Sequence, residues 1–543
     1  PAAWHADVTR DYLAFMTASE LAPLIQAREI SPVDLVEAQL ERIAELDGVL
    51  RAYIYVDADG ARAAARAAES EIAAGRYRGP LHGVTVAHKD IIEVRGLPTT
   101  AGSQVPLRDG VAPASATVAA RLEEAGAICL GKLNLFEFAS GSMGVFGFAR
   151  NPHHLGASPG ASSAGSGVAP AAGLATVVTG TDTGGSVRNP ACFCGLAGLR
   201  PTYGRVSRHG CVPLSWSQDT IGPLARSVAD VALMLGPMAG PDGHDSTAAR
   251  HDVPDYTRAL NDSPRGLRIG NPDAFFGDEL DPEIERALAE ALGVMRDLGV
   301  ELRPVSLPNV EHAPVASWII AYSEAFAFHL ERFRSLAHDY TPAFFHKITA
   351  AGLTSAEERI TAQRIRQVVT AEFAQAMQDV DVIITAANRS LPIGGGMGDM
   401  RNVLRPVSVA GYPALVVPIG FAANGLPMGM QLIGRPWEEA TLLRLGMAYE
   451  RATGWNRRRP GPPPETVPPR FGEGKEGLAP SSTGSVSPDW VLDMARLLGY
   501  EFVTETDAPY IAALLSPIKD HLGRARSDLR PEVEPPTRPA GVL

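Results

Sequence analysis

Hydrophobic and polar residues follow two periods along the first half of the chain, and these predict alternating helices and strands. Residues 31–45 carry apolar side chains at helical spacing, with Ser31 as the predicted N-cap. Residues 61–74 form an alanine-rich helical stretch, whereas 84–88 and 127–130 are apolar runs of strand length. Such alternation is typical of an α/β fold, here with a large, mixed, mostly parallel β-sheet covered by helices on both faces.

The alternation of helical and strand-like periods continues through the second half of the chain, to about residue 455. Residues 310–380 have largely helical spacing, and the apolar runs 413–420 and 429–434 predict a closing pair of strands. A chain of 543 residues with 45% hydrophobic content can bury a large core. We therefore predict one large domain over residues 1–455.

The C-terminal part of the chain has a different composition. Residues 456–487 are rich in Pro, Gly and Ser and lack periodicity, which predicts a linker. Residues 488–543 contain two predicted helices and a proline-rich end. Two short helices cannot bury enough surface to fold alone. We expect this C-terminal helical extension to dock on the core or on a partner subunit.

The densest run of glycine and serine, at 156–173, is followed by a second one at 180–190. Glycine loses the most conformational freedom on folding, so this density predicts backbone that lies close to a ligand. A serine beside converging amide groups has the nucleophile and the oxyanion site that acyl transfer needs. A flexible linker is the alternative, but charged residues at fixed places and flanking apolar segments disfavour it.

Several short motifs follow one another along the chain, at residues 81–90, 134–139, 151–152, 160–166, 180–190, 195–202, 219–223 and 425–434. Together they resemble the amidase signature family, and the resemblance covers about residues 10–455. Many ordered motifs are far more specific than a lone glycine motif. The family's fold and its hydrolysis of amide C–N bonds are therefore expected here.

The resemblance implies a Ser–Ser–Lys triad, in which Ser186 is the nucleophile, Ser162 the bridging serine and Lys89 the base. A serine hydroxyl is a weak nucleophile until a base takes its proton. Lys89 can act as that base only when it is neutral, so we expect burial to lower its pKa. Without the two serine motifs, a structural ion pair between Lys89 and Asp90 would be the preferred interpretation.

The family pattern also implies a cis peptide bond before Ser162 and an oxyanion hole of backbone amides. Asp182 and Arg188 are interpreted as structural support, because a charge-assisted pair would order the loop between them. The expected oxyanion donors are Thr183, Gly184, Gly185 and Ser186.

Two departures from the family pattern bear on the substrate. The loop 140–148 lacks the acidic, threonine-rich stretch of glutamine-dependent amidotransferase subunits, and Arg401 stands where those subunits have an aspartate for the glutamine amino group. A site without that polar partner discriminates against glutamine. Met143, Phe146 and Phe148 predict an apolar pocket, with packing in the core as the alternative.

Charge and cysteine content narrow the expected partners. A net charge of −12 gives no overall attraction for nucleic acid or an anionic membrane. Four cysteines form neither a disulfide framework nor a zinc set, so no metal and no cofactor are expected. The start of the chain has no signal-peptide pattern and no apolar run long enough to span a membrane, which favours a cytoplasmic protein.

These observations predict an amidase that hydrolyses a small amide, carbamate or aryl or acyl amide. The expected partner is a small-molecule substrate, with no nucleic acid, no membrane and a possible homodimer. One alternative is an amidotransferase A-type subunit that supplies ammonia for tRNA-dependent amidation. Another is a non-catalytic interaction protein, which only the C-terminal helices suggest.

Overall fold

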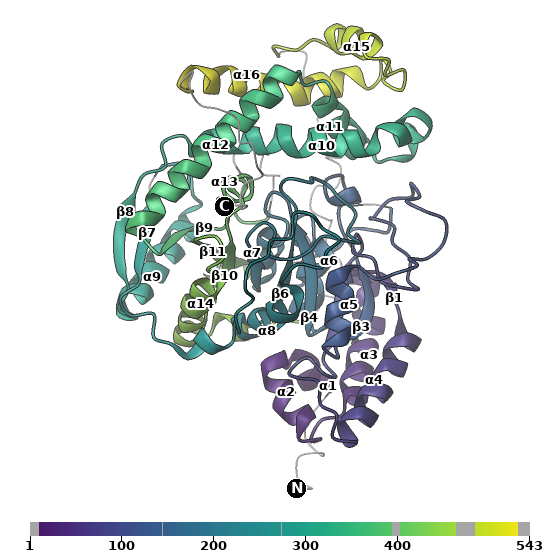
Figure 1. Ribbon diagram of the computed structural model, residues 1–543, viewed down its shortest axis with the longest axis vertical. Coiled ribbons are helices and arrows are strands. Elements are labelled where there is room, and N and C mark those ends of the chain that lie inside the picture. Colours follow the sequence, from purple (N-terminus) through teal and green to yellow (C-terminus); the bar gives the residue numbers. More distant parts are fainter. Residues whose placement is uncertain (1–9, 144, 273, 394–401, 463–483, 530–543) are drawn as a thin grey trace.

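One mixed sheet forms the centre of the structure, a computed structural model that describes residues 10–143, 145–272, 274–393, 402–462 and 484–529. In these residues 11 strands pair in the order β1-β3-β2-β4-β6-β5-β10-β11-β9-β7-β8 (Figure 1). The strands are β1 Tyr53–Val56, β2 Thr85–Lys89, β3 Ile128–Leu133, β4 Val177–Asp182, β5 Ala197–Arg200, β6 Thr220–Ala225, β7 Arg268–Pro272, β8 Glu301–Val305, β9 Val382–Ala386, β10 Ala414–Phe421 and β11 Pro427–Gly434.

Parallel ladders occur in two parts of this sheet. Strand β2 pairs in parallel with both β3 and β4, and β7 pairs in parallel with both β8 and β9. Antiparallel pairs join these two parts through β6, β5, β10 and β11. The predicted closing pair of strands is confirmed, since β10 and β11 form an antiparallel ladder.

Helices cover both faces of the sheet, as predicted for an α/β fold. Their bounds follow the caps that the sequence indicates; Ser31, for example, accepts a hydrogen bond from the amide of Val33 at the start of α3. The helices are α1 Arg10–Phe15, α2 Ala18–Gln26, α3 Pro32–Leu50, α4 Ala58–Ala73, α5 Thr117–Glu124, α6 Ala164–Ala171, α7 Arg188–Cys194, α8 Val228–Met238, α9 Pro282–Asp297, α10 Ala313–Leu336, α11 Pro342–Gly352, α12 Ala356–Asp379, α13 Arg405–Ala410, α14 Glu439–Thr453, α15 Pro488–Leu497 and α16 Ala508–Asp528.

Strand β10 shows how the sheet separates two hydrophobic cores. Leu415 and Val417 belong to the core that contains residues of α8 and α14, whereas Val416 belongs to the core that contains residues of α6 and α7. Successive side chains of a strand point to opposite faces, so an apolar run of this kind needs helices on both sides.

The chain after α14 returns to helical structure in α15 and α16, which contact each other. The two helices predicted within residues 488–543 are present, and Ser487 caps α15 by accepting from the amide of Trp490. The division into residues 1–455, 456–487 and 488–543 stays a prediction. Within the described ranges, no helix is both long and apolar enough to cross a membrane.

Candidate active site

Lys89 lies at the end of β2, and its side chain is fully buried. Its Nζ donates to the Oγ of Ser162 and to the Oγ1 of Thr181, each at 2.8 Å. Asp90, the next residue, forms its ion pair with Lys132 of β3 instead, at 2.8 Å. The structural alternative for Lys89, an ion pair with Asp90, therefore does not occur in this geometry.

Burial determines the charge state of this amine. Desolvation lowers the pKa of Lys89 from 10.5 to about 7, and the more distant Cys211, Asp219 and Asp182 only partly oppose that shift. Both of the bonded oxygens are hydroxyls, which can donate to a neutral amine as well as accept from an ammonium. Lys89 can consequently exchange a proton near neutral pH.

The loop before α6 brings Ser162 to this amine. Gly160 has a φ of +91°, and a Cβ there would lie 2.6 Å from the Cα of Pro190, so only glycine fits. The amide of Ala161 donates to the Oδ1 of Asn189, and the Ala161–Ser162 peptide bond is cis. Ser162 and Ser186 line the same cavity, of about 290 Å³.

The turn between β4 and α7 carries the predicted oxyanion donors. The amide of Gly185 donates to the Oδ1 of Asp182 at 2.9 Å, so this donor is already used within the loop. The expectation that Gly185 contributes to an oxyanion hole does not fit this geometry. The remaining predicted donors are Thr183, Gly184 and Ser186, which all line the cavity.

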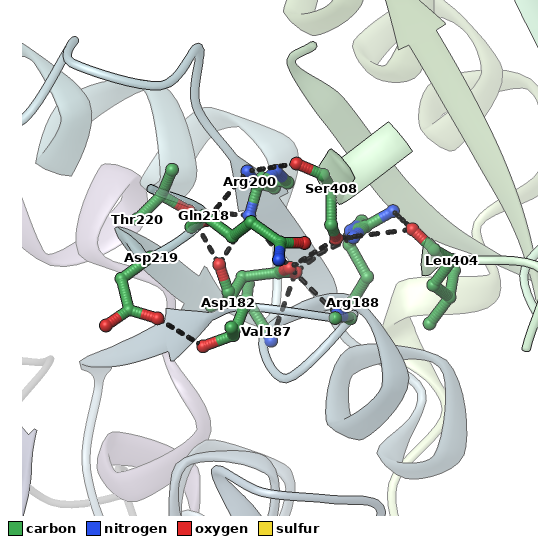
Figure 2. A network of polar contacts seen from close by, with 12 residues as sticks. Asp182, Val187, Arg188, Arg200, Gln218, Asp219, Thr220, Leu404 and Ser408 are labelled. Atoms are coloured by element: carbon green, nitrogen blue, oxygen red, sulfur yellow. Dashed lines mark hydrogen bonds and ion pairs between the residues drawn. The ribbon is translucent and has the colours of Figure 1, made fainter. Parts of the chain in front are cut away.

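Asp182 and Arg188 form the fully buried polar centre of this turn (Figure 2). The guanidinium of Arg188 binds both carboxylate oxygens at 2.9 Å, and Arg200 approaches Oδ1 at 3.1 Å. Burial alone would raise the pKa of Asp182, but the two arginines hold it well below its usual range. Arg188 also donates to the Oγ of Ser408 in α13. The network therefore ties the turn between β4 and α7 to a distant part of the chain.

Several residues of the site escaped the sequence analysis. Thr181, which bonds to Lys89, could have been found, because it lies on β4 just before Asp182. The cavity is also lined by three residues that helices supply: Tyr322 on α10, Lys347 on α11 and Arg405 at the start of α13. They come from helices without a motif, so sequence spacing contained no signal for them. Arg405 donates to the Oγ of Ser317 and the OH of Tyr322.

The predicted apolar pocket residues lie elsewhere. Met143 is buried in the core that contains residues of α3, α4 and α6, and Phe148 packs against that core. Among the described residues that line the cavity, Met143, Phe146 and Phe148 do not occur, and the aromatic ones are Phe136, Phe193 and Tyr322. Arg401 lies outside the described residues. Nowhere in the described part of the chain are three or more His, Cys, Asp or Glu side chains grouped to hold a metal ion.

Comparison with known sequences identifies the class of protein. The sequence model of the Amidase family matches residues 34–443, so the chain belongs to this family. The resemblance to the amidase signature family is thereby confirmed. A curated relative, the A-type subunit of Glutamyl-tRNA(Gln) amidotransferase from Roseiflexus sp. (strain RS-1), is 42% identical over 486 residues, covering 83% of this chain and 99% of that protein.

The solved structures that resemble this chain include a peptide amidase and an amidotransferase subunit. The native peptide amidase from Stenotrophomonas maltophilia has a TM-score of 0.73 and 33% identity, covering 82% of this chain and 98% of that one. The A-type subunit of Glutamyl-tRNA(Gln) amidotransferase from Thermotoga maritima has a TM-score of 0.64 and 28% identity, covering 82% and 94%. The amidase fold is common to both.

These relatives contradict one expectation. We predicted a small-molecule substrate and no nucleic acid, but the curated relatives at about 42% identity are named as one subunit of an enzyme of glutamyl-tRNA. That prediction is wrong. Its physical basis was the net charge of −12, which describes the whole chain and carries no information about a local surface or about a partner's surface.

Proposed function

We propose that this chain cleaves the C–N bond of a carboxamide through an acyl-enzyme on Ser186. The observation that carries the proposal is the buried amine of Lys89, bonded at 2.8 Å to Ser162 and to no carboxylate in the described residues. A buried lysine with a depressed pKa beside a serine is a candidate base. Ser162 shares its cavity with Ser186, which gives the base a route to the nucleophile.

The proposed reaction starts with attack of the Ser186 Oγ on the carbonyl carbon. The proton of Ser186 passes to Ser162, and the proton of Ser162 passes to the neutral amine of Lys89. Amides of Thr183, Gly184 and Ser186 would stabilise the oxyanion, a contribution of about 2.7–4 kcal/mol per donor. Lys89 then returns its proton, through Ser162, to the leaving amine as the C–N bond breaks. Water repeats the same steps and releases the acid.

A second candidate is an amidotransferase A-type subunit that releases ammonia from an amide for tRNA-dependent amidation. It is supported by curated relatives, which are 42% identical to this chain and are named as such subunits. The same Ser186, Ser162 and Lys89 would serve both candidates, because each requires cleavage of a carboxamide. The two candidates differ in the fate of the ammonia and in the need for further subunits.

Labelling of the nucleophile tests the proposed chemistry. The full chain is incubated with an alkyl fluorophosphonate, and the adduct is located by peptide mass spectrometry. We expect one adduct on Ser186, and none in Ser186→Ala. The matched control is Ser166→Ala, in the glycine-rich run that carries Ser162, whose Oγ donates to the carbonyl oxygen of Thr179; this variant should label normally. An adduct on another residue, or no adduct, would refute the proposal.

Ammonia release separates the two candidates. The purified chain is assayed with L-glutamine and with benzamide, and ammonia is measured. Release from benzamide by the chain alone favours hydrolysis, whereas glutaminase activity that needs added subunits and tRNA favours the amidotransferase. Ser186→Ala should abolish either activity.

A further inference from the structure

The last two described helices lie across three helices, two of which, α10 and α11, contribute residues to the active-site cavity. Helices α15 and α16, here called the C-terminal helical pair, lie over α10, α11 and α12 at the top of Figure 1, and α16 contacts all three. The pair lies beyond the residues that match the Amidase family. It is therefore an addition to the catalytic domain, and its contacts indicate what it contributes.

The contact with α11 combines one polar contact with aromatic packing, at Phe345 and His346. The Nε2 of His346 lies 2.9 Å from the Oδ1 of Asp507, the residue directly before α16. The His346 ring also stacks on Tyr510, with centroids 5.0 Å apart and planes 5° apart. Further along, Phe502 packs against Phe345 and Phe333. Helix α11 is thus held at several points by one short segment.

The neighbouring position on α11 faces the cavity. Lys347 lines it, and its Nζ donates to the carbonyl oxygen of Ser140 at 3.2 Å. The same Nζ lies 5.4 Å from the ring centroid of Tyr322, a cavity residue of α10. Adjacent helical residues are rotated by about 100°, so a shift of the face that carries His346 moves Lys347 with it.

We propose that the C-terminal helical pair clamps α11 and α10 in position, and that the affinity of the cavity for its substrate depends on this clamp. The inference rests on the proposed function for the identity of the cavity. A helix of 11 residues is marginally stable without tertiary packing, and the pair provides much of the packing of α11 on its outer side. The clamp acts on the position of Lys347 and Tyr322, while the Lys89–Ser162 pair lies on other elements.

The test uses the full chain with the double variant Asp507→Asn/Tyr510→Ala, which removes the carboxylate that contacts His346 and the ring stack. The matched control is Arg526→Gln, on the same helix, whose pair with Glu357 is exposed. Hydrogen exchange of residues 342–352 should become about tenfold faster in the double variant, because local opening costs less. Acetylation of Lys347 by sulfo-NHS-acetate should also become faster, and Arg526→Gln should change neither rate.

Kinetics with 4-nitrophenyl butyrate complete the test. We expect KM to rise about fivefold and kcat to change less than twofold, since the chemical groups stay in place. Unchanged exchange in 342–352, or faster exchange without a change in KM and Lys347 acetylation, would overturn the proposal. If the double variant does not fold, Phe502→Leu provides the same readouts with a milder change. Failure of the wild type to hydrolyse the ester or to label at Ser186 refutes the proposed function, while the exchange and acetylation measurements still decide the clamp.

Discussion

Two fully buried lysines on neighbouring strands of this protein have different partners. Lys132 on β3 pairs with the carboxylate of Asp90 at 2.8 Å. Lys89 on β2 bonds only to hydroxyls among the described residues, those of Ser162 and Thr181. A buried charge is costly unless it is paired, so the lack of a carboxylate partner favours the neutral amine of Lys89. The partner, and not the burial, separates a structural lysine from a candidate base.

The largest expected effect concerns Lys89 itself. In Lys89→Met, amide hydrolysis at pH 8 should fall by about 10³-fold or more, because a positioned base contributes about 10²–10⁴-fold and the relay has no substitute. The measurement is kcat/KM with the best substrate of an amide panel. A loss below tenfold would place the base elsewhere.

The same variant should become more stable. The folded pKa of Lys89, about 7, lies below its unfolded value, so protonation opposes folding. This penalty grows as the pH falls from about 10 to 7 and is constant below that range. We therefore expect Lys89→Met to raise Tm at pH 6 and to raise it less at pH 9. A lower Tm at both values would contradict the assigned charge state.

Lys132→Met should produce the opposite result. Removing one partner of a buried ion pair costs about 3–5 kcal/mol of unfolding free energy, because Asp90 is left buried without its cation. Chemical denaturation measures this loss. Lys132→Met/Asp90→Leu should recover much of it, and if the double variant is no more stable than the single one, the pair is not the cause. The folded single variant should still label at Ser186.

The smallest effect is expected at Thr181. Thr181→Val keeps the shape of the side chain and removes one of the two hydroxyls that orient Lys89. We expect kcat to fall about tenfold with little change in Tm, since a small misplacement of a catalytic group is costly. Thr179→Val, two residues earlier on β4, is the control, because its Oγ1 contacts His88 and not Lys89. An equal loss of kcat in both variants would indicate a general effect on strand β4.

The resemblance to the amidase signature family pointed to Lys89, Ser162 and Ser186. The structure places the Lys89 amine 2.8 Å from the Ser162 hydroxyl and both serines on one cavity, while their catalytic roles stay a prediction. The cap of α3 follows from local sequence alone. The choice between Asp90 and the serines as partner of Lys89 also has a simple explanation. Adjacent residues of an extended chain point in opposite directions, so Asp90, directly after β2, points away from the side of Lys89 and pairs with Lys132.

The rest of the candidate site depends on packing between segments that are distant in the sequence. Tyr322, Lys347 and Arg405 reach the cavity from helices whose sequences contain no motif. Met143 and Phe148 belong to loop 140–148, next to the site in sequence, yet they pack in or against a core that contains residues of α3, α4 and α6. The use of the Gly185 amide by Asp182 is equally a matter of geometry. Composition also could not reveal the class of partner that the relatives' names indicate.

The most direct test of a neutral Lys89 as base is the pH dependence of Ser186 phosphonylation. The rate of adduct formation with an alkyl fluorophosphonate is measured between pH 5 and 10 by intact mass, in wild type and Lys89→Met. We expect a rate that rises with pH, with a midpoint near 7, and the loss of this inflection in the variant. A wild-type rate that is constant between pH 6 and 9, or an inflection that persists in Lys89→Met, would contradict a neutral Lys89 as the base.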